Sequence, residues 1–594
     1  MRRTAIFLVA FGFFLSLVAV ACGGGELAAR SHDGGTDDAT TDGGPDTDGQ
    51  TGDGGDGGAV VVTCETLTPS ADTCEVTGSG PTKIFKGTVL TPEKVYVGGQ
   101  VAVDDQGKIT CAGCDCAKGG ETVVTCADAV ISPGLINTHD HITYTQDQPY
   151  TDKGVRYEDR QQWRLGGATN RPKIPAAGSA SAAQISWGEL RFMMGGATSL
   201  VGSGGQKGLV RNLDQAANEE GLAQPAVKFD TFPLDDTSGT KRTTDCNYGG
   251  AATTVASFSA NDAYEPHTSE GLDTTAHNEF LCQSSTTYDT TLPGLSNDLV
   301  ISKTSIIHGI GLQPDDYAEM AAAGTGLIWS PRSNITLYGD TAHVSEAATM
   351  GVNIALGTDW MPSGSSSLLR ELSCADSFNA TYLDHYFTDQ QLWQMVTINA
   401  AMVTKMDDVI GTLATGKVAD ITIFAAHGKA PFRSVIEAEP KDVALVMRGG
   451  TVLYGDDGVV AALGSSTCSS VDVCSVAKRV CTMDEVGKSY EDLKTAAGAG
   501  VYPAFQCGAP TNEPSCSPMR PESVDGSTIY TGVSSTDDTD GDGIPNATDN
   551  CPKIFNPIRP MDSGKQGDAD NDGVGDVCDP CPLDANTTTC TTSN

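Results

Sequence analysis

Two histidines stand one residue apart at the end of an apolar run, Ile131–His141, that a Pro-Gly pair interrupts. In an extended chain alternate side chains share a face, so His139 and His141 can bind one metal ion while Asp140 points elsewhere. Two neighbouring loop histidines would give the same pattern by chance. Further ligands are therefore needed, because a catalytic metal takes about three or four protein ligands and keeps one position open for water.

Three downstream segments offer such groups. His267 is followed three residues later by a carboxylate, Glu270, while His308 and Asp359 each end an apolar run. The spacings from His139 onward fit four strand–helix units, then one long unit, then two short ones. The groups are therefore predicted at the ends of strands one, five, six and eight of an eight-stranded barrel, where C-terminal strand ends meet at one mouth.

Five short motifs follow one another in this order: PGLINTHDH at 133–141, HTSE at 267–270, IIHG at 306–309, SPRSN at 330–334 and GTD at 357–359. Together they resemble the amidohydrolase superfamily, in its branch of cytosine, guanine and adenosyl deaminases and triazine hydrolases. The resemblance covers about residues 80 to 460 and continues into GTLATGKVAD at 411–420, which is similar to the closing signature of the family. Thr268, Ser269 and Trp360 depart from the usual pattern, which bears on the substrate rather than on the metal.

The resemblance implies an α/β fold, with a (β/α)8 TIM barrel and a discontinuous β-sandwich domain. It also implies one divalent metal, zinc or iron, held by His139, His141, His267 and Asp359. In such a site the metal lowers the pKa of a water molecule and Asp359 takes its proton. Glu270 then passes a proton to a ring nitrogen or to the departing amine, and His308 stabilises the tetrahedral intermediate. The expected activity is hydrolysis of a non-peptide C–N bond, as in deamination of a cyclic amidine or heteroaromatic amine.

Two other functions remain open on the sequence. Amide or lactam hydrolysis at a binuclear centre, as in dihydroorotase-like or dipeptidase-like relatives, would use a carboxylated lysine on strand four, for which Lys228 is the candidate. An ordinary exposed or strand-end lysine is the other interpretation of Lys228. The third function is that of a Ca²⁺-dependent surface binding protein with an inactive barrel, and the complete set of clustered ionisable groups argues against it.

The N-terminus has the pattern of a secretory signal, because two arginines precede an apolar run, Ala5–Ala21, that is too short for a stable transmembrane anchor. Cys22 follows a sequence that resembles a bacterial lipobox. We therefore expect a signal peptide at 1–21 and a lipid on Cys22 that holds the protein at a membrane of the cell envelope, periplasmic or on the outer-membrane surface. An ordinary signal peptide cut nearby is the alternative, and both export the chain. Residues 22–60, rich in Gly, Asp and Thr, predict a disordered tether.

The composition fits an exported enzyme with acidic appendages. The formal net charge of the 594 residues is −39, which argues against nucleic acid as a partner, because phosphate binding needs clustered Lys and Arg. A small-molecule substrate is expected instead. The 19 cysteines fit an oxidising compartment. In that compartment disulfides are favoured over a zinc knot for Cys111, Cys114, Cys116 and Cys126.

Alternating apolar residues predict the elements that position the site. Short strands form two pieces of the β-sandwich, 61–130 and 412–465, on either side of the barrel at 131–411. Within the barrel, a helix at Ser186–Met194 leads into a strand at Ala197–Val201.

Two further features belong to the barrel region. The polar stretch 231–261 predicts a loop over the mouth, where substrate choice is made and where Cys282 can tie down Cys246. A capping-box pattern at Thr388–Gln391 predicts the start of a late helix.

The character of the chain changes after residue 465. Residues 466–534 place five cysteines among polar residues with little periodicity, which predicts a disulfide-held linker. In residues 535–594 aspartates alternate before a glycine, as Ca²⁺ binding requires, and the segment resembles thrombospondin type 3 repeats. An acidic disordered tail is the alternative. The expected calcium ligands are Asp538, Asp540, Asp542, Asp549, Asp568, Asp570, Asp572 and Asp576.

Overall fold

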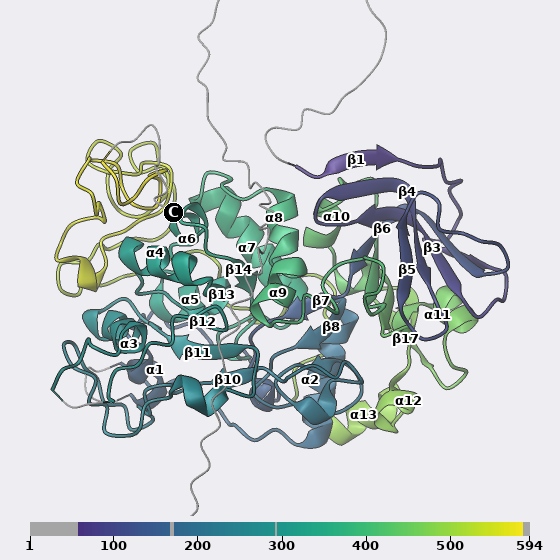
Figure 1. Cartoon of the computed structure of the whole chain (residues 1–594), viewed down its shortest axis with the longest axis horizontal. Coiled ribbons are helices and arrows are strands. Elements are labelled where there is room, and N and C mark those ends of the chain that lie inside the picture. Colours follow the sequence, from purple (N-terminus) through teal and green to yellow (C-terminus); the bar gives the residue numbers. More distant parts are fainter. Residues whose placement is uncertain (1–57, 167–170, 292–293, 586–594) are drawn as a thin grey trace, which may run out of the picture. The chain divides into compact units, whose positions relative to one another are not determined.

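The computed structural model describes residues 58–166, 171–291 and 294–585 (Figure 1). The predicted signal peptide, Cys22 and all but the last residues of the predicted tether lie outside the described residues. Among the described helices, none combines the length and the apolar character that a membrane span requires.

Eight parallel strands follow one another in chain order. Their bounds are β7 (Leu135–Asn137), β8 (Ala197–Leu200), β9 (Arg211–Asn212), β10 (Lys228–Asp230), β11 (Tyr264–Thr268), β12 (Ser305–His308), β13 (Gly326–Trp329) and β14 (Ile354–Leu356). They form two sheets, β7-β8-β9 and β10 to β14. Few hydrogen bonds join the sheet edges. Val227 N donates to Leu213 O at one junction, and at the other Thr138 N donates to Leu356 O and Asp359 N to His139 O, so the barrel order is present without one closed ladder. The predicted eight-stranded α/β fold is confirmed.

Helices lie around these strands (Figure 1) and connect β7 to β8 and each strand from β11 to β14 to the next; among the described residues no α-helix lies between β8 and β11. Their bounds are α1 (Arg160–Leu165), α2 (Ala182–Met194), α3 (Thr274–Ser284), α4 (Pro314–Ala323), α5 (Pro331–Tyr338), α6 (Val344–Thr349), α7 (Leu368–Tyr382), α8 (Asp389–Gln394) and α9 (Ile398–Val403). The capping box that was predicted at Thr388 is present and begins α8. α2 begins earlier than predicted, because Ser181 and Gln184 form another capping box before it.

The barrel interior is filled with small and branched side chains. Four strands contribute one residue each, Ile136, Ile307, Ile328 and Ala355, and the core also includes Val201, Leu213 and Val227 beside the ends of β8, β9 and β10. Such residues are expected on the inward face of barrel strands, because alternate side chains point to opposite faces. This packed core fixes the strand ends that carry the predicted site.

The strands outside the barrel form one 11-stranded sheet. Its first piece contains β1 (Val60–Thr63), β2 (Glu75–Thr77), β3 (Lys83–Leu90), β4 (Lys94–Val103), β5 (Ile109–Gly113) and β6 (Thr122–Pro133). Its second piece contains β15 (Ile421–Ala425), β16 (Val443–Arg448), β17 (Thr451–Asp456), β18 (Ser469–Val473) and β19 (Val476–Val480), with the helices α10 (Arg433–Ile436) and α11 (Asp457–Leu463) between them.

The two pieces meet where β15 pairs antiparallel with β6, Ile423 opposite Ile131. β6 runs on to Pro133, so the barrel begins at Leu135 rather than at Ile131. β4 is one continuous strand, because its pairing with β3 shifts register beyond Gly87 instead of breaking.

Eight disulfides join cysteines of the described residues. The preference for disulfides over a zinc knot is confirmed, since Cys111 pairs with Cys116 while Cys114 and Cys126 pair with Cys64 and Cys74. The disulfide that was expected to hold the mouth loop, Cys246–Cys282, is also present. The remaining pairs are Cys374–Cys516, Cys468–Cys481, Cys474–Cys507 and Cys551–Cys578.

The prediction that residues 466–534 form a linker is wrong. The strands β18 and β19 extend the large sheet as a hairpin, and α12 (Thr482–Val486) leads to α13 (Tyr490–Ala497), which packs against α2. The hairpin was missed because its turn residues, Cys474 and Ser475, adopt positive φ without the Gly or Asn that usually signals such a turn.

The segment beyond α13 lies against the barrel. Trp187 Nε1 donates to Tyr502 O at 2.9 Å, and Arg520 Nη1 donates to the carbonyl oxygens of Tyr157 and Tyr338. The buried guanidinium of Arg559 donates to Asp340, Ile310 and Thr341 of the barrel. The C-terminal part is thus packed on the barrel rather than attached as an independent tail.

Candidate metal centre

Four predicted ligands meet at the C-terminal ends of the barrel strands. His139 Nε2 lies 3.2 Å and His141 Nε2 3.6 Å from Asp359 Oδ1, and His141 Nε2 lies 3.2 Å from His267 Nε2. Three separate segments supply these atoms. Asp140 faces away, as expected, and accepts a hydrogen bond from Thr358 Oγ1 at 2.8 Å.

The nitrogen atoms of His139 test whether this group fits a metal. The His139 ring is fully buried, and neither of its nitrogens has a hydrogen-bond partner among the described residues. A buried polar atom without a partner is costly, so an unfilled pair of ring nitrogens beside a carboxylate indicates a ligand. The set of imidazoles and one carboxylate is the donor chemistry of a zinc or iron site.

A hydrogen bond to the far nitrogen orients His267. His267 Nδ1 lies 3.2 Å from the carbonyl oxygen of Asp230, which can only accept, so Nδ1 carries the proton. The Nε2 lone pair then faces His141 and is free to bind a cation. Metal-binding histidines usually have such a partner for their second nitrogen.

Three residues at the strand ends adopt left-handed backbone angles. Ser269, His308 and Asp359 have φ of 55°, 72° and 54°, which non-glycine residues seldom adopt. Surrounding contacts hold this strain, since Ser269 Oγ donates to Ala276 O at 2.9 Å and Ser333 Oγ donates to Asp359 Oδ2 at 2.5 Å. Backbone strain of this kind is concentrated at functional sites.

Asp359 is held in its charged form. Burial alone would raise the pKa of its carboxyl, but the neighbouring imidazoles of His139, His308 and His141 keep that pKa well below its usual value. A carboxylate of this kind can serve both as a ligand and as an acceptor of a proton from water.

Glu270 is a buried carboxyl with one phenol partner. Tyr338 OH donates to Glu270 Oε1 at 2.8 Å and accepts a hydrogen bond from Trp163 Nε1 at 2.8 Å. Burial raises the pKa of Glu270 to about 8, against the opposing charge of Arg160. Glu270 is therefore protonated at neutral pH and can donate a proton.

His308 has a defined tautomer. Trp329 Nε1 donates to Thr341 Oγ1, and Thr341 Oγ1 donates to Asn334 Oδ1, so the amide group of Asn334 faces His308 Nδ1 at 3.0 Å. His308 Nδ1 accepts that hydrogen bond, which leaves the proton on Nε2, 3.8 Å from Glu270 Oε2. His308 also lies within ligand distance of His139 and His267, but a protonated Nε2 suits a hydrogen-bond donor better than a ligand.

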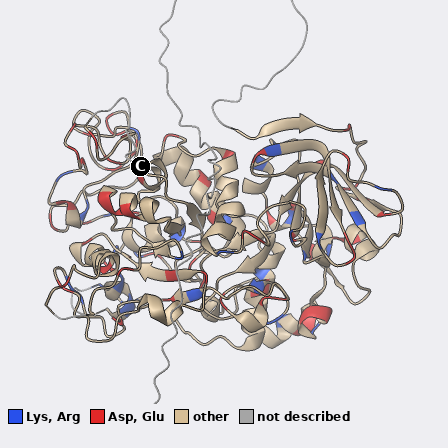
Figure 2. Ribbon diagram, in the orientation of Figure 1, with Lys and Arg blue, Asp and Glu red and all other residues tan. Residues whose placement is uncertain are grey.

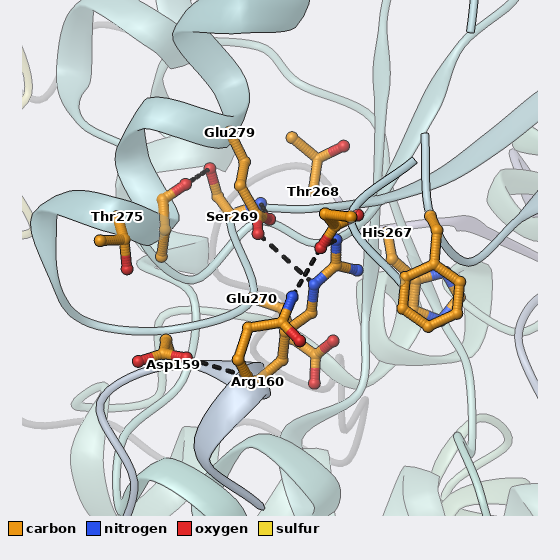
Figure 3. A network of polar contacts seen from close by, with 12 residues as sticks. Asp159, Arg160, His267, Thr268, Ser269, Glu270, Thr275 and Glu279 are labelled. Atoms are coloured by element: carbon orange, nitrogen blue, oxygen red, sulfur yellow. Dashed lines mark hydrogen bonds and ion pairs between the residues drawn. The ribbon is translucent and has the colours of Figure 1, made fainter. Parts of the chain in front are cut away.

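Arg160 joins the group, and no sequence motif predicts it. Figure 3 shows the Arg160 side chain, at the start of α1, beside Glu279 on α3; Arg160 Nε lies 3.4 Å from Glu279 Oε1 and Nη2 lies 2.8 Å from Asp236 Oδ2. Arg160 and Tyr338 were missed because neither lies in a motif or at a strand end. Their roles depend on tertiary contacts alone.

A cavity of about 370 Å³ opens onto this group. His141, His267, Glu270, His308 and Asp359 lie in its wall. Much of the rest of its lining is aromatic or basic, and these residues are Tyr144, Trp163, Phe232, Trp360, Arg160, Arg164 and Lys173. Thr231 and Phe232 also line it and belong to the loop that was predicted over the mouth.

Strand four presents Phe229 rather than Lys228 to the histidines. The Phe229 ring centroid lies 5.6 Å from that of His139 and 5.2 Å from that of His267. Because neighbouring strand residues point to opposite faces, Lys228 points away from the group. The place from which a lysine could bridge two metals is filled by an aromatic ring.

The predicted calcium ligands form two clusters of three aspartates. They are Asp538, Asp540 and Asp542, and Asp568, Asp570 and Asp572, each set within ligand distance. In most of them one carboxylate oxygen accepts a hydrogen bond from a backbone N–H of the turn, as Asp542 Oδ1 does from Ile544 N at 2.7 Å. The Oδ2 atoms of Asp540, Asp542, Asp549, Asp570 and Asp572 are buried and have no partner in the described part of the chain. Asp576 instead accepts a hydrogen bond from Ala569 N at 2.8 Å. Two acidic, partly buried loops of this kind fit cations.

Comparison with known proteins identifies two kinds of domain. The amidohydrolase family matches residues 259–453, and the thrombospondin type 3 repeat matches residues 536–559 and 566–589.

Several deaminases are also similar to this chain. A 5'-deoxyadenosine deaminase of Methanosarcina mazei is 24% identical over 388 residues, which cover 60% of this chain and 88% of that protein. A 5-methylthioadenosine/S-adenosylhomocysteine deaminase of Teredinibacter turnerae is 32% identical over 130 residues, which cover 21% of this chain and 28% of that protein. Over three deaminases of this second kind, the match spans between 28% and 39% of their own length.

Among solved structures, an adenosine deaminase of Xanthomonas campestris with bound zinc matches 62% of this chain and 92% of its own, at 16% identity and a TM-score of 0.42. The motifs, the strand order and the matched families agree. The chain carries an amidohydrolase family domain followed by two thrombospondin type 3 repeats.

Proposed function

We propose that this protein is a metal-dependent amidohydrolase that acts on non-peptide C–N bonds, as a deaminase of a heteroaromatic amine or cyclic amidine. One observation carries the proposal: three imidazoles and a carboxylate from distant segments meet beside a protonated carboxyl in one cavity. The relatives named above are deaminases, which supports this reaction class.

The residues divide the reaction between them. His139, His141, His267 and Asp359 would hold a divalent metal, zinc or iron, which would supply the Lewis acidity that activates a water molecule. Asp359, held in its charged form, would accept the proton of that water. Glu270 donates a proton to the ring nitrogen or to the leaving amine, and the Nε2–H of His308 donates a hydrogen bond to the oxygen of the tetrahedral intermediate.

A mononuclear site is favoured over a binuclear one. A bridging carboxylated lysine would have to reach the histidines from strand four, where Phe229 contacts the rings of His139 and His267. The number of transition-metal ions bound per chain of the purified full protein therefore separates deaminase-like hydrolysis from amide or lactam hydrolysis. About one tightly bound transition metal per chain supports the deaminase-like reaction, and two metals with a modified Lys228 would support amide or lactam hydrolysis.

The activity test is ammonia release by the full protein loaded with Zn²⁺ or Fe²⁺ on a panel of purines, pyrimidines and cyclic amidines. Glu270→Gln keeps the shape of the side chain but cannot donate the same proton, so we expect a loss of about 10²- to 10⁴-fold in kcat. Glu437→Gln is the matched control at an exposed site of the sheet domain. If no substrate of the panel releases ammonia while the metal is bound, the function of an inactive, Ca²⁺-dependent surface binding protein would be favoured.

We also propose that the two repeats bind Ca²⁺. The buried, unpartnered oxygens of Asp540, Asp542, Asp570 and Asp572 support this, because such oxygens require a cation or a proton. Removal of Ca²⁺ by EGTA should lower the Tm of the full protein, and Ca²⁺ but not Na⁺ should restore it. An unchanged Tm and no bound calcium would contradict the proposal.

We further propose that the protein is exported and anchored in the cell envelope through a lipid on Cys22. Eight disulfides support an oxidising compartment. Mass spectrometry of the mature N-terminus should find a diacylglyceryl cysteine, and Cys22→Ser should release the protein from the membrane fraction. A mature N-terminus at another residue would contradict the lipid anchor.

A further inference from the structure

We propose that the substrate carries an anionic group, a carboxylate or a phosphate, which Arg164 and Lys173 bind at the rim of the active-site cavity. The inference rests on the proposed function, because it names the substrate class of the same site. It follows from where the basic side chains lie, which of them are already paired, and which rings lie beside them.

The charge of this cavity is opposite to that of the whole chain. The formal net charge is −39, and Lys and Arg positions are scattered over the ribbon in Figure 2, yet three of them line one cavity. The only carboxylates in the same described lining are Glu270, whose pKa burial raises to about 8, and Asp359, a proposed ligand of the metal. The cationic side chains of this lining are Arg160, Arg164 and Lys173.

Arg160 is already neutralised, and the other two cations are not. Arg160 pairs with Asp236 at 2.8 Å and with Glu279 at 3.4 Å. Arg164 donates only to neutral oxygens, at 2.6 Å to Gln161 Oε1 and at 2.7 Å to Thr237 O. In the described residues no carboxylate forms an ion pair with Arg164 or Lys173, so both retain a full charge for a ligand.

Arg164 and Lys173 lie on neighbouring segments of the rim. The backbone N–H of Ile174 donates to Trp163 O at 2.9 Å, which places residues 163–164 beside 173–174. Arg160 and Arg164 are one helical turn apart on α1, and their guanidinium carbons lie 5.3 and 4.9 Å from the centroid of Phe232. An anion between Arg164 and Lys173 would thus lie roughly 6 Å beyond Arg160, the neighbour of Glu270.

Aromatic side chains between the anion site and the metal ligands suit a flat ring. The ring of Trp163 lies 5.0 Å from that of Trp360, and Trp360 lies 5.6 Å from Tyr144. Trp163 stands between Arg160 and Arg164 on α1, so one helix provides both the ring contact and the charge. These surfaces fit a heteroaromatic amine with a short anionic substituent.

The test uses substrates that differ only in charge. Adenosine is compared with adenosine 5′-monophosphate and with adenosine 5′-carboxylate, and cytidine with cytidine 5′-monophosphate, on the full protein loaded with Zn²⁺. We expect kcat/KM to be at least tenfold higher for an anionic member, through a lower KM. The phosphate and carboxylate arms identify which anion is preferred.

The variants assign that preference to the rim. Arg164→Gln and Lys173→Gln should each raise the KM of the anionic member by about three- to tenfold at unchanged kcat, and should leave the KM of adenosine unchanged. Lys118→Gln removes an exposed charge on the sheet domain and should change nothing. Lys173 is exposed, so its variant tests the inference even where Arg164→Gln impairs folding.

A second measurement does not depend on turnover. Inorganic phosphate should raise the Tm of wild type and of Lys118→Gln more than that of Arg164→Gln or Lys173→Gln. Equal use of neutral and anionic substrates, with both rim variants behaving as wild type, overturns the inference and leaves the hydrolase intact. If no substrate reacts, the hydrolase proposal fails, and equal phosphate shifts in wild type and rim variants would refute the anion site as well.

Discussion

The substitution Tyr338→Phe tests how the chain tunes its proton donor. The phenol is fully buried, donates to Glu270 Oε1 at 2.8 Å and accepts from Trp163 Nε1 at 2.8 Å. Removing the hydroxyl deletes one hydrogen bond to Glu270 and leaves the indole N–H of Trp163 without its acceptor. The shape of the ring and its packing stay the same.

The size of the effect follows from these contacts. A hydrogen bond to a charged group contributes about 1.5–3 kcal/mol. Tyr338 stabilises the ionised form of Glu270, so its loss should raise the pKa of Glu270, by roughly one to two units at about 1.4 kcal/mol per unit. Since Glu270 acts as an acid, activity is present below this pKa and is lost as the pH rises through it. The basic limb of the pH profile should therefore move upward, while kcat/KM near neutral pH falls roughly ten- to a hundredfold, because the acid is weaker and less well oriented.

The assay is the pH dependence of kcat/KM for the best substrate of the panel, between pH 5 and about pH 10, on wild type and variant. A bound cation shifts both profiles alike, so the displacement between them is the quantity to measure. Tyr382→Phe is the matched control, because that buried phenol donates to Gly532 O at 2.9 Å, away from the site. Tm values of all three proteins show whether each is folded.

Two results would refute the reasoning. An unchanged basic limb in Tyr338→Phe would mean that Glu270 is not the group that titrates. A downward shift would mean that the phenol stabilises the protonated acid instead. Equal losses in Tyr338→Phe and Tyr382→Phe would assign the effect to folding rather than to the acid.

Three further predictions concern the base, the C-terminal segment and the repeats. Asp359→Asn should lower kcat by at least about a thousandfold and reduce the content of bound transition metal, because one group serves as base and ligand; full metal content with full activity would contradict both roles. Loss of the Cys374–Cys516 disulfide in a double serine variant should cost about 2–5 kcal/mol in urea unfolding, and more than loss of Cys111–Cys116, because the first closes 142 residues and the second only 5; equal losses would show that loop length is not the cause. Asp542→Asn should weaken the Ca²⁺-dependent rise in Tm while leaving ammonia release unchanged at saturating Ca²⁺, and a variant that responds to Ca²⁺ as wild type does would remove Asp542 from the calcium ligands.

The grouping of the proposed metal ligands was predictable because their chemistry leaves a local pattern. His139, His141 and Asp359 lie at or just beyond the ends of apolar runs, and parallel strands bring such ends to one edge whatever the loops do. The joining of the two sheet pieces was implied by the resemblance to the amidohydrolase superfamily. Disulfides were predictable in kind, since many cysteines after a predicted signal peptide favour them, although only one pair, Cys246–Cys282, was anticipated.

The supporting residues were not predictable, because their roles exist only in three dimensions. Tyr338 ends α5 and reaches Glu270, which is 68 positions earlier in the chain. Arg160 opens a short helix in a segment without motifs. The same limit explains residues 466–534, where the strands β18 and β19 have only five residues each and their turn, Cys474–Ser475, has no Gly or Asn that would signal it.

The central claim is that four side chains from three segments share one cation. Anomalous diffraction from crystals of the full protein, recorded on both sides of the zinc and iron absorption edges, tests it directly. The account predicts one transition-metal peak within bonding distance of His139, His141, His267 and Asp359, with Phe229 beside it and no second peak toward Lys228. No peak among these residues in active protein, or two peaks bridged by a modified Lys228, would contradict it.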